Sequence, residues 1–405
     1  MDAPERDALD IIVLVGSILA LGISIMAAGS MAIIAGVNNF LQLVENAEAA
    51  WTIAVIFGSM GLLTLPGLYL SYRSVNGQAP LFSKSISPLL FTIGIGFPFS
   101  LALGALSREF NILPSFLEPI AHVIAATTPM LFMSLYIVRT LPVIPWRRIW
   151  GYFSGGLWAS PLLALLLELL TAIPLFLLLL AYVWTEVDPS ELLEPLRSTS
   201  PLGEAQLNEQ IEAFLQQPLL ILGVVLFVAV FVPLLEEFIK SIALWPTLNR
   251  GLTPLYAFAG GAVAGGAYGI FEAFFLAQPG QEWASLMIAR AGATFMHMLT
   301  TGIVSSGLAR GLKSKKWGPA LHHYFSAVAL HGLWNLAALG VGLGLLSQET
   351  GVRLAGSSSI TLVVIGSGVV LALLALGAVF GLHTYPRYLL KQKTQTAQEA
   401  SAGVS

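Results

Sequence analysis

The sequence contains no cysteine and very little charge. Only 10% of its 405 residues are Asp, Glu, Lys or Arg, whereas a soluble domain carries about 25%. Because a soluble protein of this length needs a charged surface, the composition excludes a typical soluble enzyme, a disordered chain and a nucleic-acid-binding protein. The absence of cysteine excludes thiol nucleophiles, disulfides and thiolate metal sites. A multi-span membrane protein is the class that remains.

Hydrophobic residues make up 56% of the chain and gather in long runs. A helix that crosses a bilayer needs about 20 consecutive apolar residues. We therefore predict an all-α fold, a polytopic bundle of about ten transmembrane helices. Pro161 and Pro174 could kink or split the fifth of them. The expected spans are 11–36, 51–72, 86–106, 119–138, 155–184, 218–245, 254–278, 284–308, 319–345 and 360–382.

The basic residues of the loops predict how the chain is oriented. Cytoplasmic loops carry an excess of Lys and Arg. With the N-terminus and every second loop on one side, the opposite side holds only Arg108, Arg197 and Arg353 among the loop cations. A wrong number of spans would scramble this asymmetry. We therefore expect both termini in the cytoplasm, in an integral membrane protein whose surroundings are the lipid bilayer.

The spans and the polar segments between them predict five regions. A long acidic segment separates the first five spans from the next four, and the end of the chain is polar. The expected regions are an N-terminal five-span region (1–184), an acidic extracytoplasmic loop (185–217), a four-span core (218–345), a final span (346–385) and a disordered cytoplasmic tail (386–405).

Ionisable groups within a bilayer are energetically costly and are candidates for function. Apart from Glu168, and from histidines near the ends of spans such as His122, those in the expected spans fall in spans six to nine. They are Glu236, Glu237, Lys240, Glu272, Arg290, His297 and His331, and Asn335 is a polar neighbour of the last. At 1.5 Å per helical residue, Glu236, His297 and His331 each lie roughly 18–21 Å from the cytoplasmic end of their span. Three helices should thus place a carboxylate and two imidazoles at one depth.

Spans seven and eight form an expected hairpin centred near Gln281. Glu272 lies nine residues before this centre and Arg290 nine after it. The two side chains should have matched depth, and an ion pair between them lowers the energy of both in lipid. We interpret the pair as at least partly structural. A direct role for Glu272 at the site would require helix tilt that brings it toward His297.

The residues that are absent narrow the possible chemistry. The four Asp residues lie outside the deep parts of the spans, and neither Gly-x-Ser-x-Gly nor His-Glu-x-x-His occurs. Aspartyl, serine and common zincin sites are therefore not expected, and a glutamate–histidine site remains. In one version Glu236, His297 and His331 hold Zn²⁺ and leave one position open.

The other version needs no metal. Glu236 or Glu237 would be the base that activates water, His297 would orient it, and His331 with Asn335 would stabilise the oxyanion. Lys240 lies one turn after Glu236, on the same helix face, and would support the site together with Glu272 and Arg290. The sequence leaves both versions open.

Four ordered motifs resemble the PrsW family of intramembrane proteases, within the superfamily of CAAX-processing and bacteriocin-related membrane proteases. The similarity covers residues 218–345, and Ala273 departs from it where Asn often follows the Glu. The motifs are Leu-Leu-Glu236-Glu237-Phe-Ile-Lys240, Gly-Ala-Tyr268-Gly-Ile-Phe-Glu272, Arg290 leading to His297, and His331-Gly-Leu-Trp-Asn335.

The resemblance implies an endopeptidase that cleaves membrane-anchored proteins, for example anti-sigma factors, in a bacterial plasma membrane. It implies that Glu236 and Glu237 activate water with His297 and His331 as partners. Two rival hypotheses stay open. Buried Glu, His, Lys and Arg also build the relays of proton- or ion-coupled transporters, although we find no inverted repeat. A non-enzymatic membrane scaffold could keep the same residues for packing alone.

Overall fold

The computed structural model is helical throughout the part of the chain that it describes, and contains no β-sheet there. The all-α class is therefore confirmed. The described residues are 8–79, 81, 87–110, 117–139, 144–186, 218–248, 252–276, 282–350 and 357–402. Most of the predicted acidic loop, residues 187–217, lies outside these ranges.

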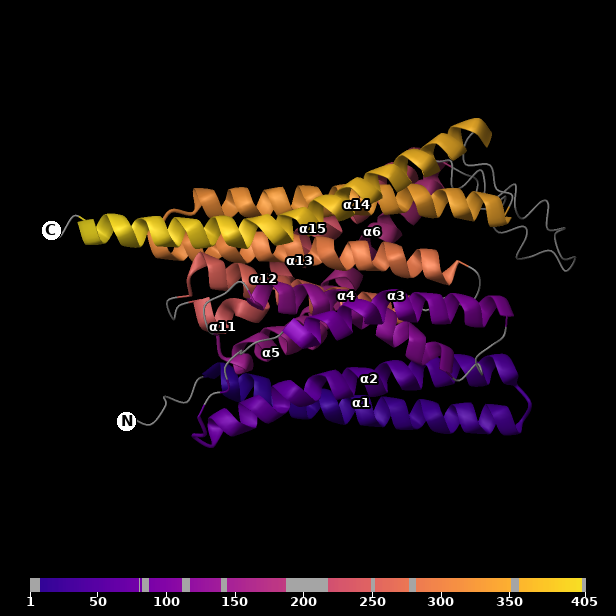
Figure 1. Cartoon of the computed structure of the whole chain (residues 1–405). Coiled ribbons are helices and arrows are strands. Elements are labelled where there is room, and N and C mark those ends of the chain that lie inside the picture. Colours follow the sequence, from indigo (N-terminus) through magenta and orange to yellow (C-terminus); the bar gives the residue numbers. More distant parts are fainter. Residues whose placement is uncertain are drawn as a thin grey trace, which may run out of the picture. The chain divides into compact units, whose positions relative to one another are not determined.

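The helices follow the expected spans closely (Figure 1). They are α1 (Ala8–Phe40), α2 (Val44–Val75), α3 (Ser87–Phe110), α4 (Glu118–Arg139), α5 (Trp146–Ser154), η2 (Gly155–Ala159), α6 (Ser160–Glu186), α9 (Pro218–Leu226), η3 (Phe227–Phe231), α10 (Val232–Ser241), η4 (Ile242–Leu244), α11 (Trp245–Leu248), α12 (Pro254–Phe275), α13 (Trp283–Ser314), α14 (Gly318–Thr350) and α15 (Ser357–Ala402).

Within the described residues, nine helical segments are long and apolar enough to cross a membrane. The tenth expected span, 284–308, is present as α13 but falls short on hydropathy. It carries Arg290, His297 and several buried Thr and Ser side chains. A helix enclosed by other helices can carry polar groups that lipid would not tolerate, because its neighbours satisfy their hydrogen bonds.

Two prolines that follow π-helical turns leave their helices unbroken. η2 ends two residues before Pro161 and η3 ends two residues before Pro233. A proline ring crowds the carbonyl four residues earlier and has no N–H to donate. A widened turn relieves this crowding without ending the helix. The fifth expected span is therefore continuous from α5 through η2 into α6.

The chain forms two compact units. Each change of unit falls inside a continuous helix (α6, α10, α14 or α15). Unit 1 comprises Met1–Leu162, Glu237–Ala327 and Ala375–Ser405, and unit 2 comprises Leu163–Glu236 and Val328–Leu374. Glu236 and Glu237 are consecutive residues of α10, yet they belong to different units.

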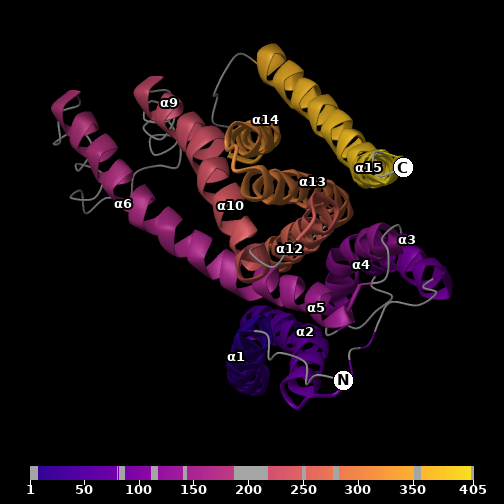
Figure 2. The ribbon, with the colours of Figure 1, turned by 90° about the vertical axis from the view of Figure 1, so that its left-hand side faces the viewer.

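Helix α12 is the centre of unit 1. It packs against α13, α4 and α5 (Figures 1 and 2), and nearly all of its residues are buried. The backbones of α12 and α13 approach very closely: a Cβ atom at Gly265 would lie 2.2 Å from the carbonyl oxygen of His297. Only glycine fits there, which is the usual reason for small residues at membrane helix contacts.

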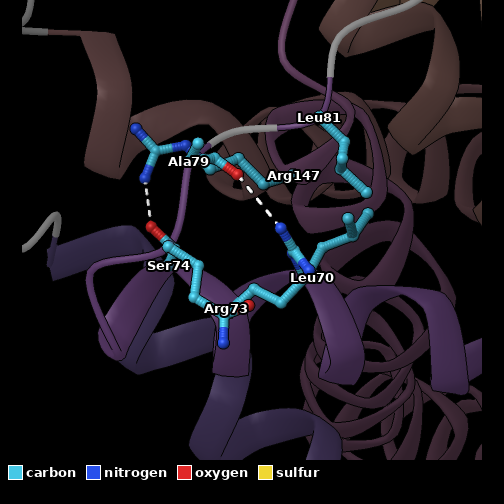
Figure 3. A pocket seen from close by; sticks show the side chains of 7 residues that line it. Leu70, Arg73, Ser74, Ala79, Leu81 and Arg147 are labelled. Carbon is cyan, nitrogen blue, oxygen red and sulfur yellow. Dashed lines mark hydrogen bonds between the residues drawn. The ribbon is translucent and has the colours of Figure 1, made fainter.

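A buried ion pair joins the N-terminal helices of unit 1 to α5. Asp10 of α1 is 3% exposed and accepts a hydrogen bond of 2.7 Å from Ser74 of α2. Arg147 of α5 forms short contacts with both Asp10 and Ser74, and Figure 3 shows its approach to Ser74. Asp10 and Arg147 lie near the ends of expected spans. Together with Ser74 they link three helices.

Helix α15 continues to Ala402, beyond the expected final span. In the segment after Pro386, Leu389 is 4% exposed and is buried within unit 1. Just before it, the hydroxyl of Tyr385 forms hydrogen bonds with Ser306 of α13 at 3.2 Å and with His323 of α14 at 3.0 Å. These contacts extend the helix past the final span.

Candidate active site

Helix α10 presents three buried ionisable residues, Glu236, Glu237 and Lys240, which are 4%, 0% and 0% exposed. Consecutive residues of an α-helix point about 100° apart, since a turn takes 3.6 residues. The two glutamates therefore face different neighbours. Sequence reasoning left both as candidate bases, and the contacts of each now distinguish them.

Glu237 is held by three donors within unit 1. Its Oε1 accepts from Lys240 Nζ at 3.3 Å and from Thr300 Oγ1 at 3.0 Å. Its Oε2 accepts from Thr301 Oγ1 at 3.3 Å. A buried carboxylate is tolerated only when it is paired and hydrogen-bonded in this way. Glu237 therefore anchors α10 to α13.

Lys240 connects this anchor to His297. Its Nζ lies 2.8 Å from His297 Nδ1 and 4.3 Å from the centroid of the Tyr268 ring, a distance suited to a cation–π interaction. An ammonium group donates and cannot accept. Nδ1 of His297 is therefore the acceptor, and the ring proton sits on Nε2.

The Nε2–H group of His297 points toward Glu272. Its Nε2 donates to Glu272 Oε2 at 2.9 Å, and Arg290 Nη2 donates to the same oxygen at 2.5 Å. The Glu272–Arg290 ion pair expected from the hairpin is therefore present. Glu272 also reaches His297, because the glycine contact brings α12 and α13 close together.

These contacts form a continuous polar chain through unit 1, from Glu237 through Lys240, His297 and Glu272 to Arg290. Both ring nitrogens of His297 have partners in it. The imidazole is therefore firmly oriented, and a metal ion could bind it only by replacing one of these partners. Its role as a metal ligand stays a prediction.

In unit 2, Glu236 meets His331 of α14. Glu236 Oε2 lies 3.8 Å from His331 Nε2, and the side chains are 6% and 2% exposed. Figure 2 shows α14 beside α9, the helix that leads to Glu236. A carboxylate and an imidazole that face each other in a buried position are suited both to metal binding and to proton transfer.

Asn335 lies one turn after His331 and contacts main chain. Its Nδ2 donates to the carbonyl oxygen of Val228 in η3 at 3.0 Å. The oxyanion role that the sequence suggested for Asn335 would use the same amide group. In the structure, the Asn335 amide is instead hydrogen-bonded to the Val228 carbonyl.

Sequence reasoning missed several residues that support the site. Thr300 and Thr301 lie three and four residues after His297, a spacing that places them near its helix face. His122 was also missed: its Nδ1 accepts from Trp283 Nε1 at 3.2 Å, and its Nε2 donates to the carbonyl of Ala273 at 3.0 Å. It thereby fixes the end of α12 directly beside Glu272.

The model of one protein family, described as PrsW family intramembrane metalloprotease, matches residues 204–365. The match covers less than half of the chain, so this segment is what resembles the PrsW family. The PrsW segment includes α9 to α14 and the start of α15, and so every residue of the candidate site. This chain is therefore a PrsW-like peptidase and an integral membrane protein. Comparison with curated proteins and with solved structures gives no match.

A PrsW metalloprotease implies a metal ion, and the donors of unit 2 fit one. Zinc is bound by imidazole and carboxylate at about 2.0–2.2 Å, which separates two tetrahedral ligand atoms by about 3.3 Å. The 3.8 Å between Glu236 and His331 needs only a small inward movement. Glu237 fits poorly, because both of its oxygens already accept hydrogen bonds.

Proposed function

We propose that this chain is an intramembrane endopeptidase that hydrolyses peptide bonds of membrane-anchored proteins at Glu236 and His331. The observation that carries the proposal is the buried contact between these two side chains at 3.8 Å. It lies within the PrsW segment, on helices that are otherwise strongly apolar. A site buried among such helices acts on a chain that is itself in the membrane.

The two adjacent glutamates take different roles in this proposal. Glu236 would activate the attacking water, because it faces His331. Glu237 holds α10 in place through Lys240, Thr300 and Thr301. A carboxylate has two oxygens, so Glu236 can hold a metal ion with one and accept the proton of water with the other.

Zinc is the metal that this donor set favours, with Glu236 and His331 as ligands. A bound Zn²⁺ ion lowers the pKa of its water to about 7 and polarises a carbonyl group. The sequence predicts His297 as a third ligand. His297 belongs to unit 1, where Lys240 and Glu272 occupy its two nitrogens. Binding a metal would require His297 to exchange one of these partners.

The substrate class follows from where the site lies. A peptide bond can reach Glu236 only from a segment that enters the membrane, and such a segment must unfold locally to expose its backbone. Single-span proteins meet this condition. We extend the proposal to anti-sigma factors in a bacterial plasma membrane, the class suggested by the family resemblance.

The test is cleavage of a single-span reporter by purified protein in liposomes. We expect Glu236→Gln and His331→Ala each to reduce cleavage more than about 100-fold. Glu168→Gln is the matched control, since it also changes an intramembrane glutamate of unit 2 but leaves the pair intact. Wild-type rates in both pair variants would overturn the proposal. A proton flux coupled to solute uptake, without cleavage, would favour a transporter.

A further inference from the structure

The helix that leads to Glu236 has a break in its main-chain hydrogen bonding. In η3 the N–H of Val232 donates to the carbonyl of Phe227, five residues back. The next residue is Pro233, which has no N–H. The carbonyl of Val228 would need Val232 as its donor in an α-helix and residue 233 in a π-helix. It therefore receives neither helical donor.

A carbonyl group without a donor is costly in a membrane, where no water is available in the apolar core. The structure supplies the donor from another helix: Asn335 Nδ2 lies 3.0 Å from the Val228 oxygen. The side-chain amide of α14 thus stands in for the N–H that proline removes.

The same face of α14 is shaped to approach the break. A Cβ atom at Gly332 would lie 2.1 Å from the carbonyl oxygen of Ala229, so any larger residue would push the helices apart. His331, next to this glycine, meets Glu236. On α14, Gly332 therefore allows the close approach, Asn335 makes the hydrogen bond and His331 contacts Glu236.

We propose that Asn335 is a positioning residue that completes the helix at Pro233 and thereby sets His331 against Glu236. The two helices run in opposite directions at this point. Asn335 meets Val228, and one turn back along α14 His331 meets Glu236, which lies eight residues after Val228. Fixing the first contact fixes how far α14 slides along η3 and α10, and hence the second. This role differs from direct stabilisation of an oxyanion.

The test is a double-mutant cycle that returns the missing N–H. We expect Asn335→Ala to shift the unfolding equilibrium of purified protein about 10-fold or more, the usual effect of leaving a buried acceptor unsatisfied. In a Pro233→Ala background residue 233 can donate to Val228, so the same substitution should have a much smaller effect. The cycle subtracts the separate effect of removing the proline.

Pro161→Ala is the matched control, because Pro161 also follows a π-helical turn, η2. The effects of Pro161→Ala and Asn335→Ala on the unfolding free energy should be additive. Should Pro233→Ala fail to fold, Asn335→Gln and Asn335→Asp give a second comparison. Gln keeps a donor amide, whereas the carboxylate of Asp repels the Val228 carbonyl. Equal stability of these two variants, or a full loss in the Pro233→Ala background, would overturn the inference.

Cleavage of the reporter gives a second measurement of the role of Asn335, and this measurement rests on the proposed function. A positioning role predicts that activity lost in Asn335→Ala returns in the double variant with Pro233→Ala. An equal loss of kcat in both backgrounds, at normal stability, would overturn positioning and show direct contact with the reacting groups. If the wild-type protein cleaves nothing, the proposed function fails, while the stability cycle still decides this inference.

Discussion

His297 Nε2 donates a hydrogen bond of 2.9 Å to Glu272 Oε2, across the closely packed helices α12 and α13. The opposite nitrogen of the ring accepts from Lys240. The imidazole is thus held from both sides by groups of opposite charge. This arrangement determines which nitrogen carries the proton and which way the ring faces, and the following predictions test its consequences.

Glu272→Gln should lower kcat by roughly 10–100-fold with little change in KM, as is usual when a group that orients a site imidazole is lost. The amide would also leave the charge of Arg290 uncompensated. Steady-state cleavage of the reporter measures the effect. Glu282→Gln is the control, since Glu282 is exposed and precedes α13. Equal kcat in the two variants would show that the Glu272 contact does not matter for activity.

Glu237→Gln and Glu236→Gln should differ in stability. Gln at 237 leaves the buried ammonium of Lys240 without its charge partner, and breaking a buried pair costs about 3–5 kcal/mol. Gln at 236 should abolish cleavage while the unfolding temperature stays close to that of the wild type. Thermal unfolding in detergent measures both. The reverse order of stabilities would contradict the division of roles between the two glutamates.

Gly265→Ala should separate α12 from α13, because its Cβ would lie 2.2 Å from the His297 carbonyl oxygen. Backbone cannot move aside as a flexible side chain can, so we expect destabilisation of several kcal/mol, about 2–5. Gly366→Ala in α15 is the control, since a Cβ atom at that position would have no neighbour within 4 Å among the described residues. There alanine should stabilise the helix slightly. Similar unfolding temperatures for both variants would contradict this packing.

Metal content should depend on Glu236 and His331. Purified protein is expected to carry about one zinc ion per chain, and Glu236→Gln or His331→Ala should lower that content. Elemental analysis measures it, alongside loss of cleavage on treatment with a chelator. His297→Ala decides the third ligand: a loss of zinc would make His297 a ligand, and retained zinc with low kcat would make it an orienting group. A fully active preparation without metal would rule out the metalloenzyme version.

Much of the architecture follows from composition and spacing. Apolar runs of sufficient length can be stable in lipid only as helices, so hydropathy located nearly every described helix. Counting residues from the hairpin centre near Gln281 predicted that Glu272 and Arg290 meet, because two antiparallel helices have equal rise per residue. The contact of Tyr385 with Ser306 could not be predicted in this way, because it joins helices that are distant in sequence.

The sequence by itself determined that this is a helical membrane protein and that most of the ionisable residues deep in its expected spans fall in four consecutive spans. Only the tertiary structure decided which of Glu236 and Glu237 is anchored, how His297 is oriented, and that Asn335 bonds to Val228. Those results depend on how each helix is rotated and on the π-helical turn before Pro233. Hydropathy sets which segments enter the membrane, but the direction of each polar side chain is set by close contacts between helices far apart in the chain.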